Sequence, residues 1–94
     1  MGDDERWFVY VLRCAGDRLY CGIAKDVDAR YAEHAAGKGA KFTRAFPPLH
    51  VVVRREVAGR ADALREERAF KALSRSKKNR QIESWLDGPR GGAA

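Results

Sequence analysis

Residues 7–23 read WFVYVLRCAGDRLYCGI and decide the fold. Residues 7–14 are rich in β-branched and aromatic side chains, which favour a strand, and the turn residues 15–17 follow them. A second short apolar run occupies residues 19–23. Two such runs with a Gly-Asp turn between them predict a β-hairpin.

The rest of the sequence predicts one more strand and three helices. Asp26 is a good N-cap for the first helix, which Gly37 would end. Either Ser74 or Ser76 could cap the last helix. The predicted elements after the hairpin are a helix over 27–36, a loop over 37–48, a strand over 49–57, a helix over 60–75 and a last helix ending near 86.

The order β-β-α-β-α-α predicts an α+β fold, a small antiparallel β-sheet of three strands flanked by helices. With a single hairpin and one further strand, we expect the helices to cover one face of the sheet. Residues 6–87 would form this single domain. The acidic residues 1–5 and the Gly-rich residues 88–94 are predicted to be flexible.

The chain of 94 residues carries a net charge of +6 and a pI near 9.7. Ten of its nineteen Lys and Arg residues lie between Arg54 and Arg80, which favours a polyanion partner such as nucleic acid over a merely solubilising surface. No apolar run approaches the length of about 18 residues that a membrane span needs. The acidic N-terminus does not resemble a secretory signal, so we expect a cytoplasmic protein.

The two cysteines, Cys14 and Cys21, fall in the predicted strands and lack the spacing of a metal site. They would pair as a disulfide only if they faced each other across the hairpin. We interpret both as small apolar core residues.

Arg30 and His34 break the pattern of the first helix. They occupy the stripe that Val27 and Tyr31 should bury against the sheet. A buried, unpaired guanidinium costs several kcal/mol, so Arg30 must meet an acid, a ligand or water. Two interpretations stay open: both residues lie at the edge of the stripe and reach solvent, or they face a functional cleft.

The hairpin and the second long helix pose similar questions. Tyr10 and Tyr20 share one face of the hairpin only if paired residue numbers sum to an even value, as in Leu12 opposite Tyr20. On the helix, Glu66 and Glu67 lie beside the apolar stripe, so that one carboxylate should point toward the core region. The ordinary alternative is an ion pair such as Glu67 with Lys71 at i+4.

These residues together resemble the GIY-YIG nuclease family, and most closely its small stand-alone members of the UPF0213 kind. The resemblance rests on FVY at 8–10, YCG at 20–22, and the spacing Tyr-x9-Tyr-x9-Arg-x3-His that ends at His34. It extends through GKGAKFTR at 37–44 to the helix that carries Glu67. Phe8, Val9 and Cys21 replace Gly, Ile and Ile of the family letters.

The resemblance implies hydrolysis of phosphodiesters with one divalent ion, Mg²⁺ or Mn²⁺. Tyr20 would be the general base for the attacking water, and Tyr10 would orient that water or Tyr20. Arg30 would bind the scissile phosphate, and His34 would support Tyr20 or contact the phosphate. The E-x-x-x-K pattern favours Glu67 over Glu66 as the metal ligand.

Two features depart from the family. Some relatives carry a lysine where this chain has Ile23, for which Lys25 or Lys38 could substitute. Some also place an asparagine in the last helix, where Asn79 stands, but an ordinary exposed helix asparagine is the favoured interpretation of Asn79.

Basic residues should bind the nucleic-acid backbone without reading its sequence. We expect these contacts from Lys25, Lys38, Lys41, Arg44, Arg75, Lys77 and Lys78. The sequence offers no recognition helix or zinc finger to read bases. We therefore expect low sequence specificity, or a protein partner that supplies it, with DNA favoured over RNA as substrate.

The resulting hypothesis is a metal-dependent endonuclease of DNA, with a role in repair or recombination. The alternative is a DNA- or RNA-binding module of the same fold, with little or partner-dependent nuclease activity. A protein-interaction domain would leave the anomalies on two helices unexplained.

Overall fold

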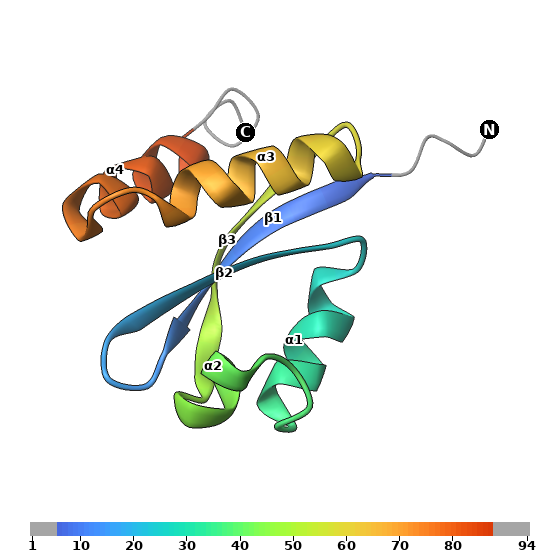
Figure 1. Cartoon of the computed structure of the whole chain (residues 1–94), viewed down its shortest axis with the longest axis vertical. Coiled ribbons are helices and arrows are strands. Elements are labelled where there is room, and N and C mark those ends of the chain that lie inside the picture. The colour runs from blue at the N-terminus through green and yellow to red at the C-terminus, as the bar shows by residue number, and fades with distance from the viewer. Residues whose placement is uncertain (1–5, 88–94) are drawn as a thin grey trace.

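The computed structural model describes residues 6–87, which form three strands and four helices (Figure 1). In chain order these are β1 (Trp7–Cys14), β2 (Arg18–Ala24), α1 (Val27–Ala35), α2 (Lys41–Ala45), β3 (Pro48–Val57), α3 (Arg60–Lys71) and α4 (Arg75–Leu86). The strands form one antiparallel sheet in the order β2-β1-β3. The predicted α+β class with a three-stranded antiparallel sheet is confirmed.

The predicted hairpin is formed by β1 and β2. Gly16 and Asp17 in its turn have φ angles of 75° and 59°, in the left-handed region that glycine and aspartate tolerate best. Leu12 pairs with Tyr20, and Tyr10 pairs with Gly22, so the register is even. Tyr10 and Tyr20 therefore lie on the same face of the sheet.

Helices cover both faces of the sheet, and the expectation of a single covered face was wrong. In Figure 1, α3 and α4 lie on one side of the strands and α1 and α2 on the other. The reason is visible in β1, where four consecutive residues, Val9 to Leu12, are at most 1% exposed. Such a central strand has no solvent face, and its uninterrupted apolar run is the sequence signal for burial on both sides.

Two separate apolar clusters follow from this arrangement. Val9 and Val11 join the cluster under α3 and α4, which includes Phe70. Tyr10 and Leu12 join the cluster under α1 and α2. The cysteines are buried, free and divided between the two clusters, so they do not form a disulfide.

The helix limits follow the capping residues. Asp26 caps α1 by accepting a hydrogen bond from the Ala29 backbone N–H at 3.0 Å, as predicted. The segment predicted to be a loop contains the five-residue helix α2. Helix α3 ends at Lys71, earlier than predicted, because Ser74 caps α4 and ends the continuous helix before it.

Within residues 6–87, no helix is both long and apolar enough to cross a membrane. The predicted flexible ends, residues 1–5 and 88–94, lie outside the described part of the chain.

Candidate active site

A row of buried hydrogen bonds links β1, α1 and α2. The Tyr10 hydroxyl lies 2.9 Å from His34 Nε2, and His34 Nδ1 lies 2.8 Å from Thr43 Oγ1. Thr43 Oγ1 donates to the Ala40 carbonyl at 2.9 Å. We call these four residues the buried relay. Its three side chains are each 1% exposed.

The buried relay answers the question that the pattern of α1 raised. His34 does not lie at the edge of the stripe but is buried, where burial and the nearby Arg30 charge lower its pKa and keep the imidazole neutral. Among residues 6–87, His34 and Thr43 are the only buried polar residues, and they bind each other. A buried polar pair that satisfies itself carries no desolvation penalty for an unmade hydrogen bond.

Two glycines make room for the buried relay. A Cβ atom on Gly22 would lie 2.5 Å from the Tyr10 hydroxyl oxygen, and one on Gly39 would lie 2.2 Å from His34 Nδ1. Neither distance is compatible with a side chain. These positions therefore require glycine for its size.

Tyr20 lies on the edge strand β2, beside the buried relay. Its ring centroid is 6.4 Å from that of Tyr10 and 5.0 Å from that of His34. Unlike Tyr10, Tyr20 is only partly buried, and it lines a cavity of about 300 Å³. The lining residues are Leu19, Tyr20, Cys21, Phe42, Phe70, Lys71 and Lys78. Of the two hairpin tyrosines, Tyr20 is thus the one that can reach a substrate.

Arg30 does not line the Tyr20 cavity, but it lies close enough to Tyr10 and Tyr20 to influence their pKa, and 36% of its side chain is exposed. Its guanidinium pairs with Glu33 at 2.5 Å and approaches the Tyr10 hydroxyl, and the Glu33 hydrogen bond is the main reason that the pKa of Arg30 is raised. The guanidinium is therefore neither buried nor unpaired.

The side chains of Glu66 and Glu67, neighbours on α3, have different partners. Glu67 pairs with Lys71 at 3.0 Å, and both lie close enough to Tyr20 to influence its pKa. Glu66 instead pairs with Arg55 at 2.7 Å and lines a different cavity beside Trp85. Of the two glutamates, Glu67 is thus the one near Tyr20, and its assignment as the metal ligand stays a prediction. The ion pair named as the ordinary alternative is also present.

Burial dominates the protonation of both tyrosines. It raises the pKa of Tyr10 far above the usual range of a phenol. Burial also raises the pKa of Tyr20, although the charges of Lys71 and Arg30 act in the opposite direction, and Glu67 raises it further. Both phenols are therefore neutral at pH 7 in the free protein.

Glu67 offers a metal ion a single carboxylate, which limits the kind of ion that can bind there. Within the described residues, no group of three or more His, Cys, Asp or Glu side chains could hold a metal. The side chain of Glu67 is 18% exposed and offers one carboxylate, one oxygen of which Lys71 contacts. A single carboxylate suits Mg²⁺, which keeps most of its water, and does not suit zinc or a fully protein-bound calcium.

The predicted nucleic-acid-binding residues fall into two groups. Lys38, Lys41 and Arg44 are exposed next to the buried relay, and Lys78 lines the Tyr20 cavity. Lys25, near the end of β2, lies 5.8 Å from the centre of the Trp7 ring. Their contact with nucleic acid stays a prediction.

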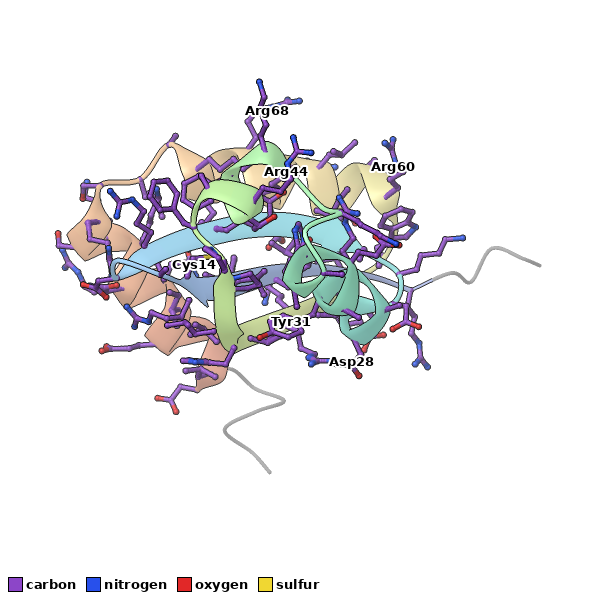
Figure 2. All side chains as sticks on the ribbon, turned by 90° about the horizontal axis from the view of Figure 1, so that it is seen from below. Cys14, Asp28, Tyr31, Arg44, Arg60 and Arg68 are labelled. Atoms are coloured by element: carbon purple, nitrogen blue, oxygen red, sulfur yellow. The ribbon has the colours of Figure 1, made fainter. Side chains whose placement is uncertain are left out.

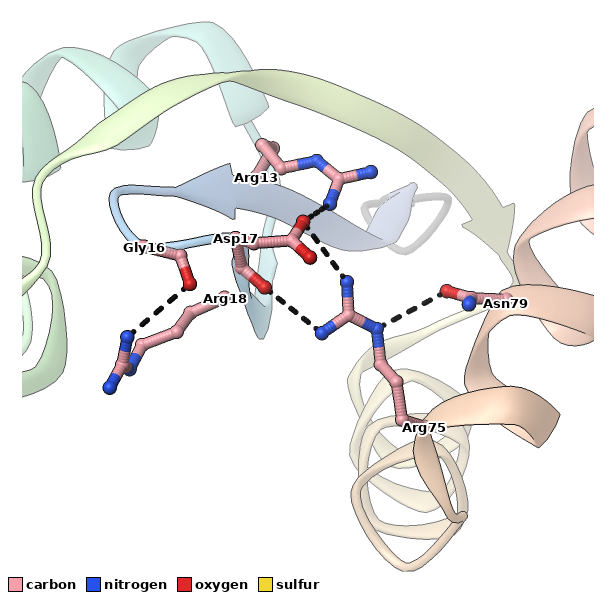
Figure 3. A network of polar contacts seen from close by, with 6 residues as sticks. All are labelled: Arg13, Gly16, Asp17, Arg18, Arg75 and Asn79. Carbon is pink, nitrogen blue, oxygen red and sulfur yellow. Dashed lines mark hydrogen bonds and ion pairs between the residues drawn. The ribbon is translucent and has the colours of Figure 1, made fainter.

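Arg75 and Lys77 lie elsewhere. Figure 3 shows Arg75 held at the hairpin turn, where it donates to the Asp17 carbonyl at 3.0 Å. Asn79 accepts a weak hydrogen bond from Arg75 at 3.4 Å in the same network. Lys77 lines a separate hollow with Arg80 on α4. We therefore do not retain Asn79 as a site residue.

Sequence reasoning missed several residues of this site. Figure 2 shows Arg60 and Arg68 of α3 projecting, together with the predicted Arg44 of α2, toward the edge of the molecule on which β2 lies. Arg60 and Arg68 belong to the basic cluster of the sequence, but nothing in the sequence shows their direction. Thr43 and Gly39 lie in the 37–44 segment on which the resemblance rests, but no pattern in the sequence indicates their contacts with His34.

Comparison with known proteins gives a consistent result. The family model of the GIY-YIG catalytic domain matches residues 6–80. The UPF0213 protein of Vibrio cholerae is 51% identical over 73 residues, which cover 77% of this chain and 72% of that protein. The UPF0213 protein of Cupriavidus necator is 42% identical over 78 residues, which cover 83% of this chain and 85% of that protein.

A solved structure is similar as well. The solution NMR structure of a UPF0213 protein from Bacillus halodurans aligns with a TM-score of 0.55 and 38% sequence identity. The alignment covers 95% of this chain and 94% of the other.

Proposed function

The chain belongs to the GIY-YIG nuclease family, and on that premise we propose that it is a metal-dependent endonuclease that hydrolyses phosphodiester bonds in DNA. One observation carries the proposal. Four side chains from three further elements lie near Tyr20 of β2: Tyr10, Arg30, His34 and Glu67.

Tyr20 would act as general base toward the attacking water, because it is the tyrosine that lines a cavity. Its phenol is neutral in the free protein, so the phenolate has to be favoured when substrate binds. Lys71 and Arg30 already act in that direction. Glu67 acts against it, and any cation that pairs with this carboxylate would therefore help to ionise Tyr20.

Arg30 would bind the scissile phosphate. Its guanidinium is partly exposed and is paired with Glu33, whose side chain is 54% exposed. A phosphate can therefore replace or join Glu33 at the free donors of the guanidinium. The same donors would stabilise the negative charge that develops on the phosphate oxygens in the transition state.

Glu67 would hold one Mg²⁺ or Mn²⁺ ion, and this ion would supply positive charge to the phosphate and to the leaving oxygen. Lys71 occupies one carboxylate oxygen at 3.0 Å. The lysine side chain is 53% exposed and flexible, so it can turn away or contact the phosphate instead.

The exposed cations of α2 and α3 would bind the nucleic-acid backbone. Backbone contacts carry affinity without sequence information. We therefore propose low intrinsic sequence specificity, DNA rather than RNA as substrate, and a repair or recombination role in which a protein partner could direct cutting.

The test compares two neighbouring carboxylates of α3. Purified wild-type, Glu67→Gln and Glu66→Gln proteins are incubated with labelled single-stranded, duplex, flap and branched DNA and with single-stranded RNA. Each reaction is run with Mg²⁺, Mn²⁺ or EDTA. We expect wild type and Glu66→Gln to cut in a metal-dependent way. Glu67→Gln should lose at least about 100-fold in cleavage rate, because it would lose the metal ion that stabilises the negative charge of the transition state.

The outcomes separate the assignments. Equal cutting by wild type and Glu67→Gln would exclude Glu67 as the metal ligand. Loss of both cutting and binding in Glu67→Gln would show a structural role.

A DNA- or RNA-binding module with little or partner-dependent nuclease activity is the second candidate. The observation in its favour is that Lys71 neutralises Glu67 and burial keeps Tyr20 protonated in the free protein. Tight binding of these nucleic acids by wild type without any cutting would establish this candidate.

A further inference from the structure

The hydrogen bonds of the buried relay have a single direction. The Thr43 hydroxyl has one proton, and the Ala40 carbonyl can only accept, so this proton lies between them. Toward His34 Nδ1, the Thr43 oxygen can then only accept. His34 Nδ1 must therefore carry a proton.

The direction continues to β1. In a neutral imidazole with its proton on Nδ1, Nε2 is a bare acceptor. The Tyr10 hydroxyl, 2.9 Å away, must donate to it. The Tyr10 oxygen is then left with its lone pairs, which can accept a hydrogen bond from the nearby Arg30 guanidinium. The direction of each hydrogen bond thus determines the direction of the next, from Thr43 on α2 through His34 on α1 to Tyr10 and the proposed phosphate-binding Arg30.

We propose that Thr43 is a positioning residue of the active site, which selects the Nδ1-protonated tautomer of His34 and thereby directs the Tyr10 hydroxyl proton to His34 Nε2, leaving the lone pairs of the Tyr10 oxygen free for Arg30. The geometry supports this assignment because the three side chains are fully buried, which leaves no solvent to replace a lost partner. The catalytic part of the inference rests on the proposed nuclease function, whereas the tautomer does not.

A structural alternative exists for Thr43. Its bond to the Ala40 carbonyl, three residues earlier, is the local bond that many threonines make near a helix start. In that case the hydroxyl would stabilise α2, and the His34 tautomer would not depend on it. The experiment must therefore report on the imidazole and not on stability alone.

The imidazole nitrogens of uniformly ¹⁵N-labelled protein report the tautomer directly in two-bond ¹H–¹⁵N correlation spectra near pH 7.5. His50 is the only other histidine in the sequence and is exposed, so a His50→Gln protein assigns the signals. We expect a protonated Nδ1 and an unprotonated Nε2 for His34 in wild type. A protonated Nε2, with or without a protonated Nδ1, would overturn the proposal.

Variants of Thr43 test its role. Thr43→Val keeps the shape and removes the hydroxyl, and we expect the His34 signals to shift toward the other tautomer or a mixture. Cleavage should slow by up to about 100-fold, the loss that small misplacements of catalytic groups can cause. Thr43→Ser restores the hydroxyl and should restore both the tautomer and most of the rate.

Two results would refute the role of Thr43: an unchanged tautomer in Thr43→Val, or a changed tautomer with an unchanged cleavage rate. If the valine protein does not fold by circular dichroism, Thr43→Ala takes its place with the same expectations. If wild type cuts no nucleic acid, the nuclease function fails, but the spectra still decide whether Thr43 sets the tautomer.

Discussion

Gly22→Ala adds one methyl group and should displace Tyr10 of the buried relay without changing any side chain of the active site. A Cβ atom at this position would lie 2.5 Å from the Tyr10 hydroxyl oxygen and 2.7 Å from Cζ of the same ring. The φ angle of Gly22 is outside the left-handed region, so the backbone itself accepts alanine. The whole effect must therefore come from the collision with Tyr10.

The magnitude follows from what Tyr10 would lose. Its ring is 1% exposed and cannot move outward without disturbing the core, and such overpacking costs about 1–3 kcal/mol. A shift of the ring also breaks its bond to His34, which leaves buried groups unpaired at about 1–3 kcal/mol. Replacing glycine by alanine restricts the unfolded chain and returns about 0.4–1 kcal/mol. We expect a net loss of about 1–6 kcal/mol of unfolding free energy.

Equilibrium urea unfolding measures this loss, and Gly59→Ala is the matched control. A Cβ atom on Gly59 would meet no atom within 4 Å, and its φ of −172° is ordinary extended backbone. The control should stay within about 0.5 kcal/mol of wild type. Equal midpoints for the Gly22→Ala and Gly59→Ala proteins would refute the claim that Gly22 makes room for Tyr10.

Three further predictions concern side chains of the site. Tyr20→Phe should retain DNA binding in fluorescence anisotropy but lose about 10²–10⁴-fold in cleavage rate, and wild-type cutting would exclude Tyr20 as the base. Burial lowers the pKa of His34 below 6.5, so the unfolded chain takes up a proton that the folded chain refuses. The unfolding free energy should therefore fall as the pH drops from about 6.5 to 5, and His34→Gln should flatten this dependence in urea titrations. The double variant Lys41→Ala/Arg44→Ala should reduce the salt slope of duplex DNA binding by about 1.8, whereas Lys77→Ala should leave the slope unchanged.

The sequence predicted the sheet well because its signals are local. The apolar runs, the Gly-Asp turn and the caps at Asp26 and Ser74 each depend on a few neighbouring residues. The register was left open between even and odd pairing. The three-residue turn between Cys14 and Arg18 decides it, because these two residues pair directly.

The covering of the sheet was predicted less well. The unbroken apolar run of β1 indicated a buried strand, but strands buried on both faces require helices on both faces. Helix α2 escaped prediction because five residues between glycines and prolines are too few for a helical period.

The candidate site divides in the same way. His34 and Arg30 were noticed because they break a helical stripe, which is a local pattern. Thr43 was not noticed, since its importance comes from a contact nine residues away in a segment without periodicity. The functions of Gly22 and Gly39 depend on which ring lies above each of them, and that is set by packing between elements.

The burial of Tyr10 and Thr43 has a consequence for exchange with solvent. Hydroxyl protons at a protein surface exchange with water rapidly, but these two hydroxyls are each on a residue that is 1% exposed. Their protons can reach water only when α1 or α2 moves off the sheet, so their exchange rates measure the free energy of that local opening. Comparing these rates with the exchange of the backbone amides of α3 and α4 would show whether α1 and α2 open independently of α3 and α4.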